Sequence, residues 1–231
     1  MWQPLEMRKA VGGRCAPAAE RRRHALQRRE VYASTGPRIT LRLFAGWGFT
    51  GEELDDADFA ALGYSAGVPM GGQLNGVCEH RGQLRILVKA SKDPLGANLD
   101  RIQIVKGWMD QGEHREQVHD VALSDGREVR EDGQVLDVGN TVDSQSATYA
   151  NTIGAAELGT VWIDREFDPE QQAFYYARVL EIPTPRWTTY DAAAFEIPPP
   201  DNVPGTIQQR VYSSPIWYEP TEAGAGSDCR G

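Results

Sequence analysis

The chain has 231 residues, of which 40% are hydrophobic and 9% aromatic, and its formal net charge is −9. This apolar content is enough for a folded core and excludes a wholly disordered chain. No apolar run reaches the roughly 18 to 20 residues that a membrane helix needs, and the acidic charge argues against nucleic acid or an anionic membrane as partner. Cys15, Cys78 and Cys229 are too widely spaced for a disulfide scaffold or a zinc knuckle.

Positive charge is concentrated at the start of the chain. Residues 1–30 contain eight Lys and Arg residues against three acids, a net charge of +5 that leaves −14 for the rest. We interpret residues 1–37 as a basic arm and a junction, with a solvated helix from Ala16 to Val31 whose apolar stripe is weak. Two alternatives stay open: a leader-like segment, although the continuous apolar region of a secretory signal is missing, and an arm that binds phosphate backbones.

From Arg38 onward, hydrophobic residues recur mainly at every second position. Ile39, Leu41 and Leu43 alternate with polar residues, which is typical of a half-buried strand. Several later runs show the same alternation or are rich in aromatic and β-branched residues. The predicted strands are 38–44, 83–89, 99–105, 117–123, 158–163, 173–182 and 211–218.

About seven short strands, separated by clusters of Gly, Pro, Asn and Asp, are typical of an antiparallel β-sandwich. We therefore predict a mainly β domain over residues 38–220. It contains one short internal helix from Asp56 to Leu62 and a helical turn from Asp191 to Phe195. Residues 221–231 are small and polar, which predicts a flexible tail.

The four histidines form no metal-binding motif. His24, His80, His114 and His119 include neither H-x-H nor H-E-x-x-H. His114 and His119 are five residues apart and would face opposite sides of a strand, so we interpret them as surface histidines in a charged loop. Cys78 and His80 would share one side of a strand and supply half of a zinc site, an alternative that lacks a second pair of ligands.

Other catalytic patterns are missing as well. There is no G-x-S-x-G elbow. The glycine-rich segment Gly67–Gly72 lacks the Lys-Ser/Thr of a phosphate loop, and Pro69 removes a backbone donor, so we predict that this segment packs Met70 against the sheet. The acidic segment Asp125–Asp143 lacks the spacing of a calcium loop and is expected to be a solvated loop. The sequence thus predicts no catalytic, cofactor-binding or metal-binding residue in this chain.

Six long segments are specific enough to indicate a family: REVYASTGPRI (29–39), GVPMGG (67–72), LDRIQIVKGW (99–108), NTIGAAEL (151–158), FYYARVLEIPTPRW (174–187) and SSPIWY (213–218). Over about residues 28 to 220 they resemble the C-terminal part of a bacterial group, domain-of-unknown-function family 3604. That family is itself similar to metallohydrolases of the polymerase-and-histidinol-phosphatase (PHP) class, in which a metal-binding α/β barrel precedes a β domain.

The resemblance implies a junction at Tyr32 to Ile39 and a last strand that carries a Pro-Ile-aromatic sequence, here Pro215 to Trp217. The barrel, with its His and Asp ligands, would precede the junction, but Met1 to His24 does not resemble the family. We therefore expect a truncated or frame-shifted chain, with a divalent metal only in the missing barrel and no catalytic residue carried over.

Two functions are compatible with these observations. The first is a non-catalytic C-terminal β domain of a PHP-like metal-dependent hydrolase, whose partner is the missing barrel or a second copy, through apolar surface exposed around the junction strand. The second is a stand-alone binding module for a ligand or partner protein, with Trp47, Trp108 or Trp187 as a platform; the alternative role for these three residues is packing. No nucleic acid or membrane partner is expected, and without a visible signal the default compartment is the cytoplasm.

Overall fold

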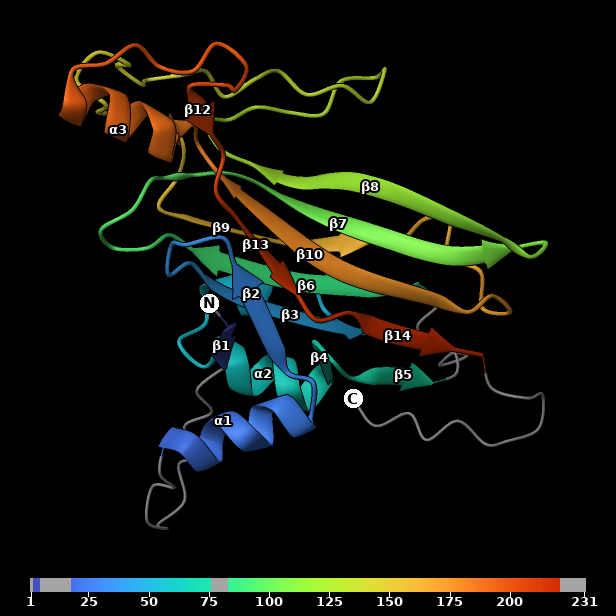
Figure 1. Cartoon of the computed structure of the whole chain (residues 1–231). Helices are drawn as coiled ribbons and strands as arrows, with labels where there is room; N and C mark the ends of the chain where they lie inside the picture. Colours follow the sequence, from blue (N-terminus) through green and yellow to red (C-terminus); the bar gives the residue numbers. More distant parts are fainter. Residues whose placement is uncertain (1, 5–17, 76–82, 221–231) are drawn as a thin grey trace.

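Two β-sheets packed face to face make up the structure, a computed structural model that describes residues 2–4, 18–75 and 83–220 (Figure 1). The predicted fold class, a mainly β antiparallel sandwich, is confirmed. Cys78, His80, the predicted tail 221–231 and most of the first seventeen residues lie outside the described part of the chain.

The larger sheet is built around β10 (Ala173–Glu181). On one side β10 pairs antiparallel with β7 (Leu99–Asp110), and β7 forms a long hairpin with β8 (Glu113–Leu123). Since β8 has no further neighbour among the described strands, it is an edge of this sheet.

On the other side of β10, two short strands follow each other: β13 (Arg210–Ser213) and β14 (Ile216–Glu219). β13 continues the sheet to β2 (Val31–Ser34) and β1 (Trp2–Pro4), whereas β14 pairs in parallel with β5 (Gln73–Asn75). The predicted strand 211–218 is therefore interrupted, because Pro215 has no N–H for a continuous ladder.

The smaller sheet has the strand order β4 (Gly67–Pro69), β3 (Thr40–Gly46), β6 (Arg85–Ser91) and β9 (Glu157–Ile163). All of its neighbouring strands run antiparallel. β9 is an edge of this sheet and contacts β8, the edge of the larger sheet.

The core lies between the two sheets and follows from strand alternation. Ile102 and Ile104 of β7, with Leu41 and Leu43 of β3, point inward and are at most 1% exposed. Tyr175 of β10 faces the same interior. Burial of an aliphatic side chain of this size stabilises a fold by about 1.5–3 kcal/mol, so the inward-facing residues hold the sheets together.

Two helical segments cover the outer face of the smaller sheet. The 3₁₀ helix η1 (Glu52–Asp55) precedes α2 (Phe59–Ala66), whose Phe59 and Tyr64 pack edge-on against Phe44 of β3. The predicted helix over 56–62 is thus displaced toward the C-terminus. α1 (Ala18–Gln27) lies in the basic arm and is shorter than predicted, since Val31 already begins β2.

The third helix, α3 (Trp187–Phe195), is longer than the predicted turn and follows the short pair β11 (Thr184–Pro185) and β12 (Thr206–Ile207). Figure 1 shows α1 and α2 on one side of the sandwich and α3 on the opposite side. No helix among the described residues is long and apolar enough to span a bilayer.

Candidate functional site

A cleft of about 520 Å³ opens between the edge strands β8 and β9. Its walls are one side of β8, most of β9 and the turn after β9. The lining includes Gln117, His119, Trp162, Asp164 and Glu166. The cleft exists because neither edge strand has a further neighbour to close the sandwich on this side.

His119 is oriented by the register of its strand. It pairs with the core residue Ile104, so strand alternation turns the imidazole toward the interior. Its ring centre lies 4.7 Å from that of Trp162, and its buried Nε2 atom has no hydrogen-bond partner among the described residues. Burial lowers the pKa of His119, although the charges of Asp164 and Glu166 oppose this shift. The imidazole is therefore neutral at pH 7.

Three polar side chains form a buried cluster beside the cleft. Lys106 Nζ lies 2.7 Å from Asp164 Oδ2, and the two side chains are 5% and 2% exposed. The Tyr175 hydroxyl donates a hydrogen bond of 2.7 Å to the same oxygen, and Lys106 donates another of 3.0 Å to the carbonyl oxygen of Glu166. Asp164 thus has the charged partner and the hydrogen bond that a buried carboxylate requires.

The electrostatics of this cluster limit its chemistry. Burial and, next, the charge of Asp164 raise the pKa of Tyr175 far above its usual value, so the phenol keeps its proton at physiological pH. A protonated phenol that donates to a carboxylate cannot act as a base or a nucleophile. The arrangement is therefore an internal ion pair that joins β7 and β10 to the turn after β9.

The structure places the predicted histidines apart. His114 and His119 lie in β8 on opposite faces of the sheet, as their spacing predicts. His114 is exposed, as predicted, but it lies in a strand rather than in a loop, because the chain reverses before Glu113, where β8 begins. The prediction is wrong for His119, which is half-buried. His24 is exposed on α1. Within the described ranges, no three His, Cys, Asp or Glu side chains are grouped so that they could hold a metal ion.

The two remaining loop predictions concern Gly67–Gly72 and Asp125–Asp143. Met70 is fully buried, as predicted. Gly71 adopts a φ of +81°, and a Cβ at this position would lie 2.2 Å from the Arg29 carbonyl oxygen, so glycine is required there. The acidic segment consists of turns whose residues are mostly exposed, in agreement with a solvated loop.

The tryptophans divide into two groups. Trp47 and Trp108 pack against the core, whereas Trp187 is 66% exposed at the start of α3. The apolar surface predicted around the junction strand is not found there: Val31 and Tyr32 are at most 6% exposed, because β2 is paired within the larger sheet. Large exposed apolar side chains instead occur on and just after α3: Trp187, Tyr190, Phe195 and Ile197.

The cluster of Lys106, Asp164 and Tyr175 was not predicted from the sequence. A signal existed for Lys106, which continues the inward-facing series of Ile102 and Ile104 in one strand, and an inward lysine requires a buried acid. Nothing local identifies Asp164 as that acid, since it is distant in the sequence.

Comparison with known proteins gives one match. The model of a family described as "Protein of unknown function (DUF3604)" matches residues 15–220. This match begins before the span of the resemblance noted above, so the expectation that Met1 to His24 is unlike the family is wrong from residue 15 onward. No curated protein and no solved structure matches the chain.

Proposed function

Because the chain belongs to the DUF3604 family of proteins of unknown function, we propose that it is a non-catalytic β domain that accompanies the metal-binding α/β barrel of a PHP-like hydrolase. In this proposal the barrel binds the divalent metal and the substrate. The β domain packs against the barrel and stabilises it.

The resemblance to the PHP class supports this role at both ends of the domain. Tyr32 to Ile39 forms β2 and the turn that leads into β3, a rigid connection for a domain on its N-terminal side. Pro215 to Trp217 leads into β14, the last described strand.

The observation that carries the functional part of the proposal is the mutual pairing of the ionisable groups in the buried cluster beside the cleft. General acid–base catalysis needs a side chain that exchanges a proton with a bound substrate. Lys106, Asp164 and Tyr175 are each at most 5% exposed and bind one another. These contacts support a role in stability rather than in bond cleavage.

The exposed apolar side chains of α3 offer a surface for the barrel. Trp187 and Phe195 are 66% and 70% exposed, and Ile197 just beyond the helix is 55% exposed. Neighbouring exposed apolar residues of this size mark interaction sites in soluble proteins. We therefore propose that the barrel, which would join the chain before α1, also reaches α3 on the opposite side of the sandwich (Figure 1).

The test is association between separately produced domains. The barrel of a longer family member is mixed with this chain, and binding is measured by size-exclusion chromatography and fluorescence anisotropy. We expect a complex of defined stoichiometry that the double variant Trp187→Ser, Phe195→Ser weakens, because apolar contact area is lost. Trp217→Ser, which changes an exposed tryptophan on another surface, is the matched control. No complex, or equal binding by all three proteins, would contradict the proposal.

A further inference from the structure

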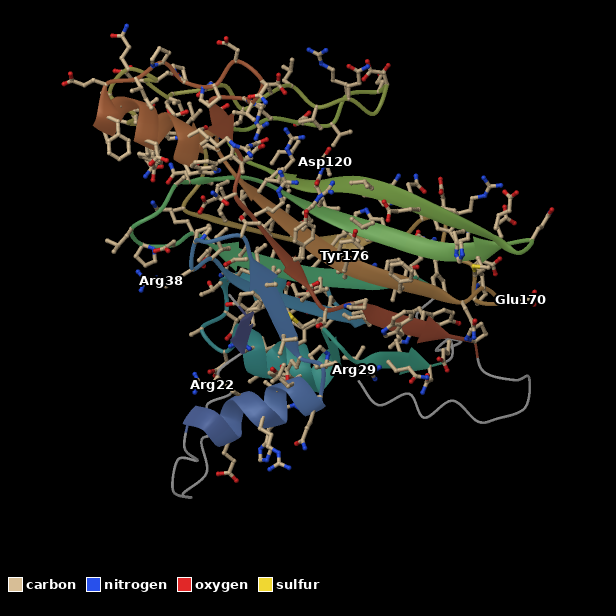
Figure 2. All side chains as sticks on the ribbon, in the orientation of Figure 1. Arg22, Arg29, Arg38, Asp120, Glu170 and Tyr176 are labelled. Atoms are coloured by element: carbon tan, nitrogen blue, oxygen red, sulfur yellow. The ribbon has the colours of Figure 1, made fainter. Side chains whose placement is uncertain are left out.

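The two sheets differ in what covers their outer faces. η1 and α2 cover the outer face of the smaller sheet, where Phe44 and Leu87 are buried under Phe59. No described helix or loop crosses the outer face of the larger sheet, which is turned toward the viewer in Figure 1. Figure 2 labels Tyr176 and Asp120 on this open face.

Strand alternation places a group of aromatic rings there. In β10, Tyr175, Ala177 and Val179 are buried in the core, so Phe174 and Tyr176 point outward. Register adds Trp217 of β14 beside Phe174, and Tyr212 of β13 lies next to Tyr176. The ring centres are separated by 5.3 Å (Trp217–Phe174), 6.4 Å (Phe174–Tyr176) and 6.4 Å (Tyr176–Tyr212). We call these four residues the aromatic platform.

A glycine makes part of the platform flat. Gly107 is the register partner of Phe174, and a Cβ on Gly107 would lie 2.2 Å from Cζ of the Phe174 ring. The ring therefore lies over the bare backbone of β7, with its other face directed away from the sheet. The Tyr176 ring is within 11° of parallel to that of Phe174, whereas the Trp217 ring is tilted by 50° relative to Phe174 and the Tyr212 ring by 45° relative to Tyr176.

Planar polar groups border the platform. On the β8 side, Arg178 Nε donates to Gln103 Oε1 at 2.7 Å, and Gln103 Nε2 donates to Asp120 Oδ1 at 2.9 Å. On the β5 side, Gln73 Nε2 donates to Glu219 Oε2 at 2.6 Å. These groups are pre-oriented by each other, and each has further donor or acceptor capacity for a ligand.

We propose that the aromatic platform binds a neutral oligosaccharide. A pyranose ring has a face of C–H groups that packs on an aromatic face, and hydroxyl groups around its rim that need donors and acceptors of the kind found here. The platform offers both features: four neighbouring aromatic rings on an open sheet face, with amide, guanidinium and carboxylate groups beside them. The proposal is independent of the association with a barrel.

The charge around the platform and the exposure of its rings favour a neutral oligosaccharide over a nucleic acid or a protein partner. Asp120, Glu219 and Glu116 lie around the platform together with Arg178, and Arg101 pairs with Asp120. The border therefore has no excess of the positive charge that a stacking nucleic-acid site needs. A protein partner would bury about 800 Å² on each side, but of the four rings only Trp217 is more than about one-third exposed.

The experiment is affinity electrophoresis of the full chain in native gels. The gels contain hydroxyethylcellulose, xylan, galactomannan or soluble starch, with polygalacturonate and single-stranded DNA as charged comparisons. We expect retardation by at least one neutral polysaccharide and by neither charged polymer. Trp217→Ala and Tyr176→Ala should each weaken binding by about tenfold, because each removes one stacking surface.

Two further variants keep the result interpretable. Trp187→Ala removes an exposed tryptophan outside the platform and should leave retardation unchanged. Gly107→Ala should weaken binding by displacing Phe174, while circular dichroism and urea unfolding report whether each variant is folded. No retardation by any neutral polysaccharide, binding only to a charged polymer, or an equal loss in Trp187→Ala and Trp217→Ala would overturn the proposal.

Discussion

Lys106 and Asp164 form an ion pair that water hardly reaches. Their charged atoms are 2.7 Å apart, and the side chains are 5% and 2% exposed. Loss of one partner from such a pair leaves a buried unpaired charge and costs about 3–5 kcal/mol, whereas an exposed pair contributes at most about 1 kcal/mol. Lys106 is therefore a stability residue, although it lies beside the cleft.

Lys106→Met keeps most of the side-chain volume and removes the charge. We expect it to lower the free energy of unfolding in urea by about 3–5 kcal/mol, because the buried Asp164 carboxylate then has no charged partner and keeps only the hydrogen bonds from the Tyr175 hydroxyl and the Glu166 N–H. Arg115→Met is the control: its guanidinium is 50% exposed and pairs with Glu113, so the loss should stay below about 1 kcal/mol. Equal losses would contradict the buried-pair assignment.

Glu181 is a buried carboxyl group whose protonation state makes the stability of the fold depend on pH. It is 2% exposed, and its Oε1 atom has no partner among the described residues. Burial and, next, the charge of Asp93 raise its pKa from 4.5 to about 7, while Lys92 acts in the opposite direction. Because the folded state holds this proton more tightly than the unfolded state, its contribution to stability is greatest at low pH and is lost as pH rises to about 7.

Glu181→Gln removes this ionisation. The variant's free energy of unfolding relative to wild type should rise between about pH 5 and pH 7, by up to about 1.4 kcal/mol per pH unit, and stay constant above this range. Comparing the two proteins at each pH cancels the titration of His119, which is common to both. The exposed Glu170→Gln should show no such slope. Parallel curves for Glu181→Gln and wild type would contradict the assignment.

At the scale of elements, the long segment between β8 and β9 is attached to the sandwich by Arg127. Its Nη2 atom lies 2.5 Å from Oδ1 of the fully buried Asp100 in β7. Its Nη1 donates to the Leu136 carbonyl oxygen at 2.9 Å, and its Nε donates to that of Ser124 at 3.1 Å. One guanidinium thus connects a solvated loop to a core strand, the geometry that arginine's fixed fork of donors allows.

Arg127→Ala should release this segment without unfolding the sheets, since Arg101 still pairs with Asp100. We expect limited proteolysis within residues 125–150 to become several-fold faster, because the open form of the loop is more populated. Arg130 is an exposed arginine in the same segment. The Arg130→Ala variant should therefore be cleaved at the wild-type rate. Unchanged cleavage in Arg127→Ala would show that other contacts hold the loop.

Elements could be predicted where one local rule was sufficient. Alternation at Ile39, Leu41 and Leu43 correctly indicated β3 and its buried face. Boundaries failed where side chains changed the local geometry: Asp56 Oδ1 accepts the Asp58 N–H at 2.7 Å, which makes a turn before α2 rather than its first residues. The register between β10 and its neighbours depends on distant pairing, which no local pattern contains.

The candidate site was less predictable than the fold. Lys106, Asp164 and Tyr175 come from three separate elements and meet only because two sheets pack face to face. The aromatic platform is not evident from single tryptophans, because two of its residues, Phe174 and Tyr176, alternate with buried residues in one strand. Outward aromatic residues in a central strand are the sequence signal that could have found it.

At the scale of the whole molecule, exposed apolar surface is concentrated on α3. We expect the isolated chain to bind a hydrophobic dye and to self-associate at high concentration, because Trp187 and Phe195 are mostly exposed. The double variant Trp187→Ser, Phe195→Ser should reduce dye fluorescence and shift sedimentation toward the monomer. A wild-type chain that stays monomeric and binds no dye would count against an interaction surface at α3.

The proposal that this chain is a non-catalytic domain can be tested by measuring hydrolysis by the purified chain. The chain is incubated with Mn²⁺ or Zn²⁺, its bound metal is quantified, and turnover of p-nitrophenyl phosphate and bis(p-nitrophenyl) phosphate is followed. If the chain is non-catalytic, the rates equal those of the metal alone, and metal-dependent turnover is expected once a PHP-class barrel is joined upstream. Metal-dependent turnover by this chain alone, above the metal background, would contradict the proposal.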